Sequence, residues 1–256
     1  MIPSWRAGFE LEIIVGNLGE PRFERELRER GPMDEASSTF CQAFAAKLRE
    51  RTGRSWSAPS RSPQRPGFYV VPEYGLDPLN WPEDRLAGVE LLTPPLPLDD
   101  AEIVRTELFE AIYEIDGDFN FFADEHTANC GWHINIDAGD GFRLDPDRFI
   151  LGVDELLLLA NNDRLFSRYT ALQRHAVGVP LLRHLAHDPT GKFLLSSALG
   201  NLLEAHAGSD KGYAANFAKL VKGYVELRHF SAESFFNGAP LTEQLERIPA
   251  AFEVWP

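Results

Sequence analysis

Hydrophobic and polar residues alternate along several short stretches of the chain, which is the pattern of β-strands with one buried face. The clearest stretch, residues 7–15, places apolar residues on one side of the backbone and the carboxylates of Glu10 and Glu12 on the other. Alternation or short apolar runs predict further strands over residues 68–71, 88–93, 131–137 and 221–230. The chain is therefore expected to contain several strands, each with a polar side of its own.

Two stretches in the first half of the chain repeat apolar residues every three or four positions and predict amphipathic helices. The first covers residues 34–51, with Asp34 as its cap. The second begins with Asp99 as its cap and is expected to end around Asp116 and Gly117. Both helices carry an apolar stripe that a sheet can cover.

The second half of the chain reads as mostly helical. Residues 145–207 open with Asp and Pro in the order of a cap and a first turn, and residues 240–252 predict a closing helix. Residues 55–67 are rich in Ser, Pro and Arg and predict an exposed loop. Strands and helices mix without regular βαβ alternation and without repeats. We therefore expect one α+β domain over residues 1–256 with a mainly antiparallel sheet.

Composition narrows the range of partners and compartments. The 256 residues carry a formal net charge of −14, which opposes binding to nucleic acid or to an anionic membrane surface. The two cysteines, Cys41 and Cys130, are too few for a disulfide framework or a CxxC zinc site, which favours a reducing cytoplasm. Neither a signal peptide nor a long apolar span is apparent. The sequence therefore predicts a soluble, unprocessed cytoplasmic protein.

The polar sides of the predicted strands carry an unusual set of side chains for a solvated surface. Such surfaces mix Lys, Thr, Ser and Gln, whereas these positions hold carboxylates, imidazole, amide and guanidinium. The residues are Glu10, Glu12, Glu90, His133, Asn135, Asp137, Glu226 and Arg228. Because side chains two apart on a strand point the same way, these residues share one surface if their strands share one sheet. A solvated face explains any single pair, but four such strands together favour a site.

Gathered carboxylates repel one another, and a divalent cation is the usual means of stabilising them. Oxygen ligands favour Mg²⁺ or Mn²⁺, and a single His among them tilts the preference slightly toward Mn²⁺. A structural zinc site fits less well, because thiolates and a second nearby His are absent from this set. The residues therefore predict a magnesium or manganese site.

Four segments resemble successive signatures of the amidoligase family, whose relatives include glutamine synthetase and glutamate-cysteine ligase. They read GFELE at 8–12, GVELLTPP at 88–95, CGWHIN at 130–135 and YVELRHF at 224–230, in the family's order. Each motif is short, but four in order form a specific combination. The resemblance implies a glutamine synthetase-like fold, in which helices cover the convex side of a curved, mainly antiparallel sheet. It also implies an ATP- and Mg²⁺- or Mn²⁺-dependent ligase that joins a carboxylate to an amine through an acyl phosphate.

The resemblance also implies roles for individual residues. The metal ligands would be Glu10, Glu12, Glu90, His133 and Glu226. The ATP contacts would include His133, Asn135 and Arg228. Glu90 and Arg228 would be catalytic, with the guanidinium of Arg228 stabilising the transferring phosphoryl group. The substrates would be a small-molecule or peptide carboxylate and an amine.

Several residues depart from the family pattern or lie outside its motifs. Asn135 stands where the family usually has a second His, and either Glu73 or Asp77 stands in for an acidic residue of a substrate strand. A YAAN segment at 213–216 is similar to a stretch that often precedes the last strand. Lys211 is the further candidate for the nucleotide. Lys192 is a candidate for the nucleotide as well, although lysines in such breaks between helices are more often merely solvated. Candidates for the substrate carboxylate are Arg164, Arg168 and Arg174, which an exposed helical face explains equally well.

Two other functions use the same kind of surface. A phosphotransferase of the guanidino-kinase type also needs acids, Arg and Mg-ATP, but leaves the phosphate on its substrate instead of releasing it. A non-catalytic member that binds metal or a peptide is the second alternative, and Asn135 is the residue that favours it. Against it, every acidic motif position is still Glu.

Overall fold

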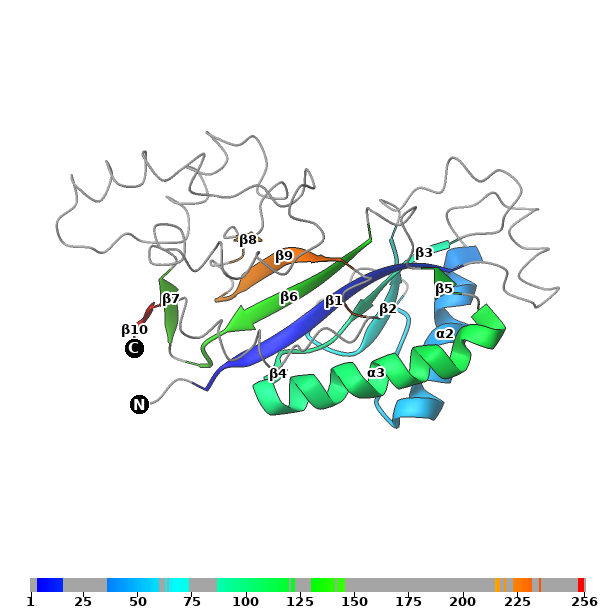
Figure 1. Ribbon diagram of the computed structural model, residues 1–256, viewed down its shortest axis with the longest axis horizontal. Helices are drawn as coiled ribbons and strands as arrows, with labels where there is room; N and C mark the ends of the chain where they lie inside the picture. The colour runs from blue at the N-terminus through cyan, green and yellow to red at the C-terminus, as the bar shows by residue number, and fades with distance from the viewer. Residues whose placement is uncertain are drawn as a thin grey trace, which may run out of the picture.

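A computed structural model gives the fold of the chain (Figure 1). It describes residues 4–15, 36–59, 63, 65–73, 87–119, 121–122, 130–140, 142–145, 215–216, 219, 223–231, 235 and 253–255. These residues form one large sheet, two helices that pack against it and a small separate pair of strands.

The large sheet has eight strands, and all of its strand pairs are antiparallel. Its path runs β2-β3-β1-β6-β9-β8, with β4 and β5 also paired to β1. The strands are β1 (Arg6–Val15), β2 (Tyr69–Pro72), β3 (Ala87–Leu92), β4 (Leu96–Pro97), β5 (Phe121–Phe122), β6 (Gly131–Asp137), β8 (Ala215–Asn216) and β9 (Val225–Ser231). A second sheet pairs β7 (Arg143–Asp145) with β10 (Glu253–Trp255). The expected α+β class with a mainly antiparallel sheet is confirmed.

Both helices lie on the same side of the sheet (Figure 1). Helix α2 (Ala36–Thr52) packs against β2 and β3, and α3 (Leu98–Phe119) packs against β1 and α2. Neither of these helices is long and apolar enough to cross a membrane. The two helices therefore cover one face of the sheet beside β1, β2 and β3, and the polar residues of these strands lie on the other face.

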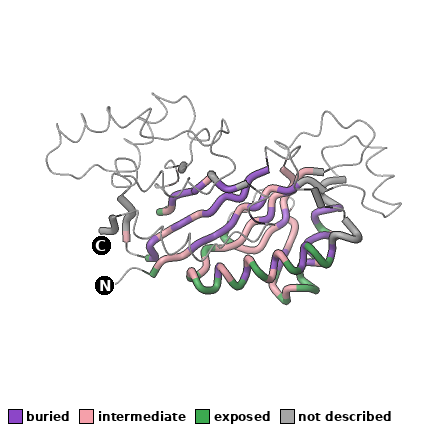
Figure 2. The backbone as a smooth tube through the Cα atoms, viewed as in Figure 1, coloured by how far each residue is buried: buried purple, intermediate pink, exposed green. Residues whose placement is uncertain are grey.

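The core is built from the alternate residues of the strands that the two-residue period singled out. In β1 these are Ala7, Phe9, Leu11 and Ile13, all at most 1% exposed. Figure 2 shows the same burial along β6 and β9 and on the inner sides of both helices. Other core members from the strands are Val70, Val89, Leu91, Trp132, Ile134, Ile136, Val225 and Leu227. Burial of this face fixes the direction in which the intervening polar residues point.

The helix bounds differ slightly from the expected ones. Helix α2 runs to Thr52 and Asp34 lies outside the described residues. Helix α3 begins at Leu98 and continues to Phe119, past the expected end at Gly117. A single glycine costs a helix only about 1 kcal/mol relative to alanine, which is too little to end it.

Two other expectations are corrected. The strand expected over residues 221–230 begins only at Val225, because Gly223 lies in a turn with φ of 88°. The segment expected as an exposed loop over residues 55–67 contains Trp56 near its start, and this side chain is 1% exposed. Its ring lies 5.2 Å from that of Phe68, so the start of the segment belongs to the core. The helical stretches expected at 146–207 and 240–252 lie outside the described residues.

Candidate metal centre

The register of the central strands brings the polar residues of distant segments together. Glu10 of β1 is the Cα partner of His133 of β6, and Glu12 is the partner of Glu90 of β3. On the other side of β6, Asn135 is the partner of Glu226 of β9. All of these side chains lie opposite the helix-covered core, since their neighbours in sequence are the buried residues.

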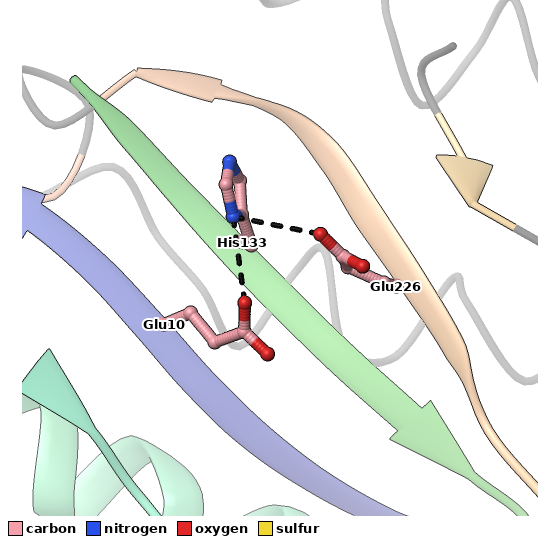
Figure 3. A group of neighbouring side chains, drawn as sticks. All are labelled: Glu10, His133 and Glu226. Atoms are coloured by element: carbon pink, nitrogen blue, oxygen red, sulfur yellow. Dashed lines mark ion pairs between the residues drawn. The ribbon is translucent and has the colours of Figure 1, made fainter. Parts of the chain in front are cut away.

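His133 lies between the carboxylates of two flanking strands (Figure 3). Its Nδ1 atom is 3.7 Å from Glu10 Oε2 and 3.6 Å from Glu226 Oε1. Both His133 and Glu226 are 2% exposed, so the group is screened very little by water. Each of the three residues offers one ligand atom, and these atoms all lie within 4.8 Å of one another. The spacing leaves room for one cation among them.

A second group uses the other side of the same imidazole. His133 Nε2 is 4.0 Å from Glu12 Oε2, and Glu12, Glu90 and His133 also offer ligand atoms within 4.8 Å of one another. Glu12 is held in place by Gly131, whose backbone N–H donates to Glu12 Oε2 at 2.8 Å. A neutral imidazole has one lone pair and one N–H, so it can ligate directly through only one nitrogen at a time. The second group therefore depends mainly on its carboxylates.

Among the described residues, the buried Nδ1 atom of His133 has no hydrogen-bond partner. Among the described side chains, the buried atoms without one include His133 Nδ1, Asn135 Oδ1 and Arg228 Nε. Nearly all buried polar atoms in folded proteins are paired, so such atoms at one place indicate a missing partner. The separations of Nδ1 from Glu10 and Glu226 exceed hydrogen-bond length. A divalent cation fits this set, because it would accept the Nδ1 lone pair and both carboxylates together.

The pKa values of the two carboxyl groups of β1 shift in opposite directions. Burial alone would raise the pKa of Glu10, but interactions with His133, Asn135 and Lys219 outweigh it and lower that pKa to about 2. Burial raises the pKa of Glu12, although His133, Gly131 and Arg228 oppose the rise. Glu10 is thus the more firmly ionised of the two.

Glu90 has the most strongly perturbed carboxyl group of the site. Burial, reinforced by the negative charges of Glu10, Glu12, Glu73 and Glu226, raises its pKa to about 9. The metal-free site therefore keeps Glu90 protonated at neutral pH, because the surrounding charge is insufficiently neutralised. A divalent cation bound beside Glu90 would offset this repulsion and favour the ionised carboxylate.

Two further side chains complete the polar face. Arg228 donates from its Nη1 atom to Glu226 Oε1, and its side chain is only 14% exposed. Asn135 donates from Nδ2 to Glu10 Oε1 at 2.7 Å. Each residue thus holds one carboxylate of the His133 group and also has one buried polar atom without a hydrogen-bond partner among the described residues.

Most of the predicted site residues meet on this face. The structure brings together Glu10, Glu12, Glu90, His133, Asn135, Glu226 and Arg228. Asp137 shares the strand but is bound instead to Arg6, at 2.8 Å. Lys211, the other predicted nucleotide contact, lies outside the described residues, as do Asp77, Lys192, Arg164, Arg168 and Arg174.

Two charged residues near the site were missed or left open by the sequence. The positive charge of Lys219 helps to lower the pKa of Glu10, and the negative charge of Glu73 helps to raise those of Glu12 and Glu90. Glu73 immediately follows β2, with its backbone N–H bonded to Gly88 O at 2.9 Å. The alternation Tyr69, Val71, Glu73 would have signalled its side of the sheet, whereas Lys219 lies outside any strand pattern.

Comparison with known proteins gives no relative: no family model, no curated protein and no solved structure matches this chain.

Proposed function

We propose that the protein is an ATP- and Mg²⁺- or Mn²⁺-dependent ligase that joins a carboxylate to an amine. The observation that carries the proposal is the pair of carboxylate groups on either side of His133, with Arg228 beside one of them. Enzymes that transfer a phosphoryl group from ATP commonly combine metal ligands with positively charged side chains on one surface. The resemblance of four segments of the chain to amidoligase signatures supports a ligase over other classes of ATP-dependent enzyme.

The two groups would hold the cations through different ligands. Glu10, Glu226 and the Nδ1 atom of His133 form the first set, and Glu12 with Glu90 forms the core of the second. Bound cations would neutralise phosphate charge and polarise the phosphoryl oxygens. The negative charge of Glu73 acts on both Glu12 and Glu90, which makes Glu73 a candidate for a further ligand in the second set.

Arg228 is the residue that we propose binds phosphate. Its Nη1 atom is engaged by Glu226, and its Nε atom is buried without a partner among the described residues. A guanidinium donates in a planar fork, so an oxyanion can receive the remaining N–H groups. This arrangement would stabilise negative charge on the phosphoryl group as it passes from ATP to the substrate carboxylate. The product of that transfer would be an acyl phosphate. Glu90 and Arg228 are the proposed catalytic residues.

The glutamine synthetase-like fold belongs to the same proposal. In its support, α2 and α3 cover one face of an antiparallel sheet while the carboxylates lie on the other. A nucleotide bound over the carboxylate face would lie near β9 and near Lys219, whose positive charge acts on Glu10.

The test measures the unfolding midpoint with ATP alone, with Mg²⁺ alone and with both, because a ligand of the native state raises stability. We expect ATP to stabilise the protein only together with Mg²⁺, and Glu226→Gln to abolish the effect. Glu114→Gln is the matched control, since Glu114 lies on α3 with a side chain that is 55% exposed. The absence of any shift in the wild-type protein would argue against a nucleotide site.

Product analysis separates a ligase from a phosphotransferase on the same surface. A ligase releases inorganic phosphate in proportion to the amide that it forms, whereas a phosphotransferase leaves the phosphate on the acceptor. Candidate carboxylates and amines are therefore screened for phosphate release. Phosphate that stays on the acceptor in every active pair would contradict the ligase proposal.

A further inference from the structure

Asn135 lies between the two strands that carry the first carboxylate group. Its Cα partner on β1 is Gly8, and its Cα partner on β9 is Glu226. Its Nδ2 atom donates to Glu10 Oε1 at 2.7 Å. A carboxylate only accepts hydrogen bonds, so this contact fixes which end of the amide faces Glu10. The Oδ1 atom is left buried and, among the described residues, without a hydrogen-bond partner.

Among the described residues, the site therefore holds two buried polar atoms without a hydrogen-bond partner, His133 Nδ1 and Asn135 Oδ1, and both can act as acceptors. They belong to residues two apart on β6, and so lie on one face between the strands of Glu10 and Glu226. The side chain of His133 is 2% exposed, so water is largely excluded from its nitrogen. A hydrogen-bond donor on a ligand would satisfy one of the two acceptors. One cation would satisfy both, together with the two carboxylates.

We propose that Asn135 Oδ1 is a fourth protein ligand of the divalent cation held by Glu10, His133 and Glu226. This inference rests on the metal site of the proposed function and assigns a ligand to it. An amide oxygen is a hard, neutral ligand of the kind that Mg²⁺, Mn²⁺ and Ca²⁺ accept. Three oxygen ligands and one imidazole favour these ions over Zn²⁺, which prefers nitrogen and sulfur.

On β1, the residue opposite Asn135 is Gly8, which has no side chain that could occupy the position of the amide. Gly8 has no side chain on the site face, and a Cβ atom there would lie 3.3 Å from Thr93 O and 3.4 Å from Pro94 O. The backbone of residues 93–94 therefore closes this side of the site, and no side chain from position 8 competes with Asn135. On that side the amide is held by its hydrogen bond to Glu10.

The first experiment measures Mn²⁺ affinity by titration calorimetry on the full chain. We expect Asn135→Ala to weaken binding by at least about tenfold, the scale of loss for groups that support a metal ion, and Asn135→Asp to retain it. Asp137→Asn is the matched control, because Asp137 lies next along the same strand face but contacts Arg6. Unfolding midpoints without metal confirm that each variant folds.

The second experiment asks whether position 135 touches the ion. Asn135→Cys is titrated with Cd²⁺, and a thiolate-to-cadmium absorption band is expected, since coordination deprotonates the thiol. The wild-type protein provides the background, because its Cys41 and Cys130 are buried. A structural role for Asn135 would not produce this band.

The outcomes separate this inference from the proposed function. If the wild-type protein binds no Mn²⁺, the proposed metal site is wrong, and the inference about Asn135 is wrong as well. If wild-type protein and Asn135→Ala bind Mn²⁺ within about twofold and Asn135→Cys shows no band, the metal site stands but Asn135 is not its ligand.

Discussion

Glu10 and His133 are direct partners across β1 and β6, and 3.7 Å separates Glu10 Oε2 from His133 Nδ1. Such a pair would ordinarily close to a hydrogen bond. Here the imidazole instead stands between carboxylates on both of its sides. The histidine is thus the shared element of two candidate cation sites, and the properties of both depend on it.

Replacing His133 with alanine is therefore expected to affect both groups at once. The variant loses a ligand of the first group and the residue whose interactions lower the pKa of Glu10 and oppose the rise at Glu12. We expect Mn²⁺ affinity to fall at least about tenfold and the metal-free protein to unfold at a lower temperature. Calorimetry and thermal unfolding measure the two effects. Unchanged Mn²⁺ affinity in His133→Ala would remove the histidine from the metal site.

Much of the site was predictable because a strand has a strict two-residue period. Once Phe9 and Leu11 are assigned to the core, Glu10 and Glu12 must point to the other face. By the same argument, Glu226 points away from the core face that its neighbour Val225 occupies. The period does not give strand order or register. The pairing of β1 with both β3 and β6 had to come from the structure.

Positions outside regular strands were harder to predict from the sequence. Lys219 follows β8 and carries no periodic signal, so its charge near Glu10 could not be foreseen. Trp56 sits in a segment whose composition indicates a loop, yet tertiary packing against Phe68 buries it. The local composition indicates whether a segment forms regular secondary structure. Whether a side chain in it is buried depends on contacts with residues that lie elsewhere in the sequence.

Arg228 is expected to be essential for turnover. Arg228→Ala should lower the rate of phosphate release by roughly 10³-fold, by analogy with other arginines that stabilise a transferring phosphoryl group. Arg228→Lys should recover only part of the loss, because an ammonium lacks the planar fork of donors. Steady-state phosphate release, with Mn²⁺ binding as the control, measures the effect. A change below about tenfold in Arg228→Ala would exclude this role.

The pKa of Glu90 predicts how the stability of the metal-free protein depends on pH. The ordinary value is 4.5 and the folded value is about 9, so between these limits the folded state keeps a proton that the unfolded state has lost. Because the native state binds more protons, stability falls as pH rises through this window, by at most about 1.4 kcal/mol per pH unit for one group. The stability that this proton contributes is fully present below the ordinary pKa of 4.5 and is lost as the pH rises toward 9.

Urea unfolding at several pH values within that window measures the slope, and Glu90→Gln provides the comparison because its amide does not titrate. We expect the wild-type slope to be the steeper of the two without metal. Saturating Mn²⁺ should weaken or reverse it, since a bound cation favours the ionised carboxylate. Parallel slopes for wild type and Glu90→Gln would show that Glu90 is ionised in the folded protein.

The last prediction tests the packing that supports the carboxylate face from below. Leu108 and Ile103 both lie on α3, but Leu108 is 1% exposed and Ile103 is 51% exposed. Leu108→Ala should lower the free energy of unfolding by about 2–5 kcal/mol, because it removes buried methyl groups and leaves a cavity. Ile103→Ala should change it by no more than about 0.5 kcal/mol. Chemical denaturation of both variants measures the contrast, and comparable losses would mean that α3 presents a different face to the sheet.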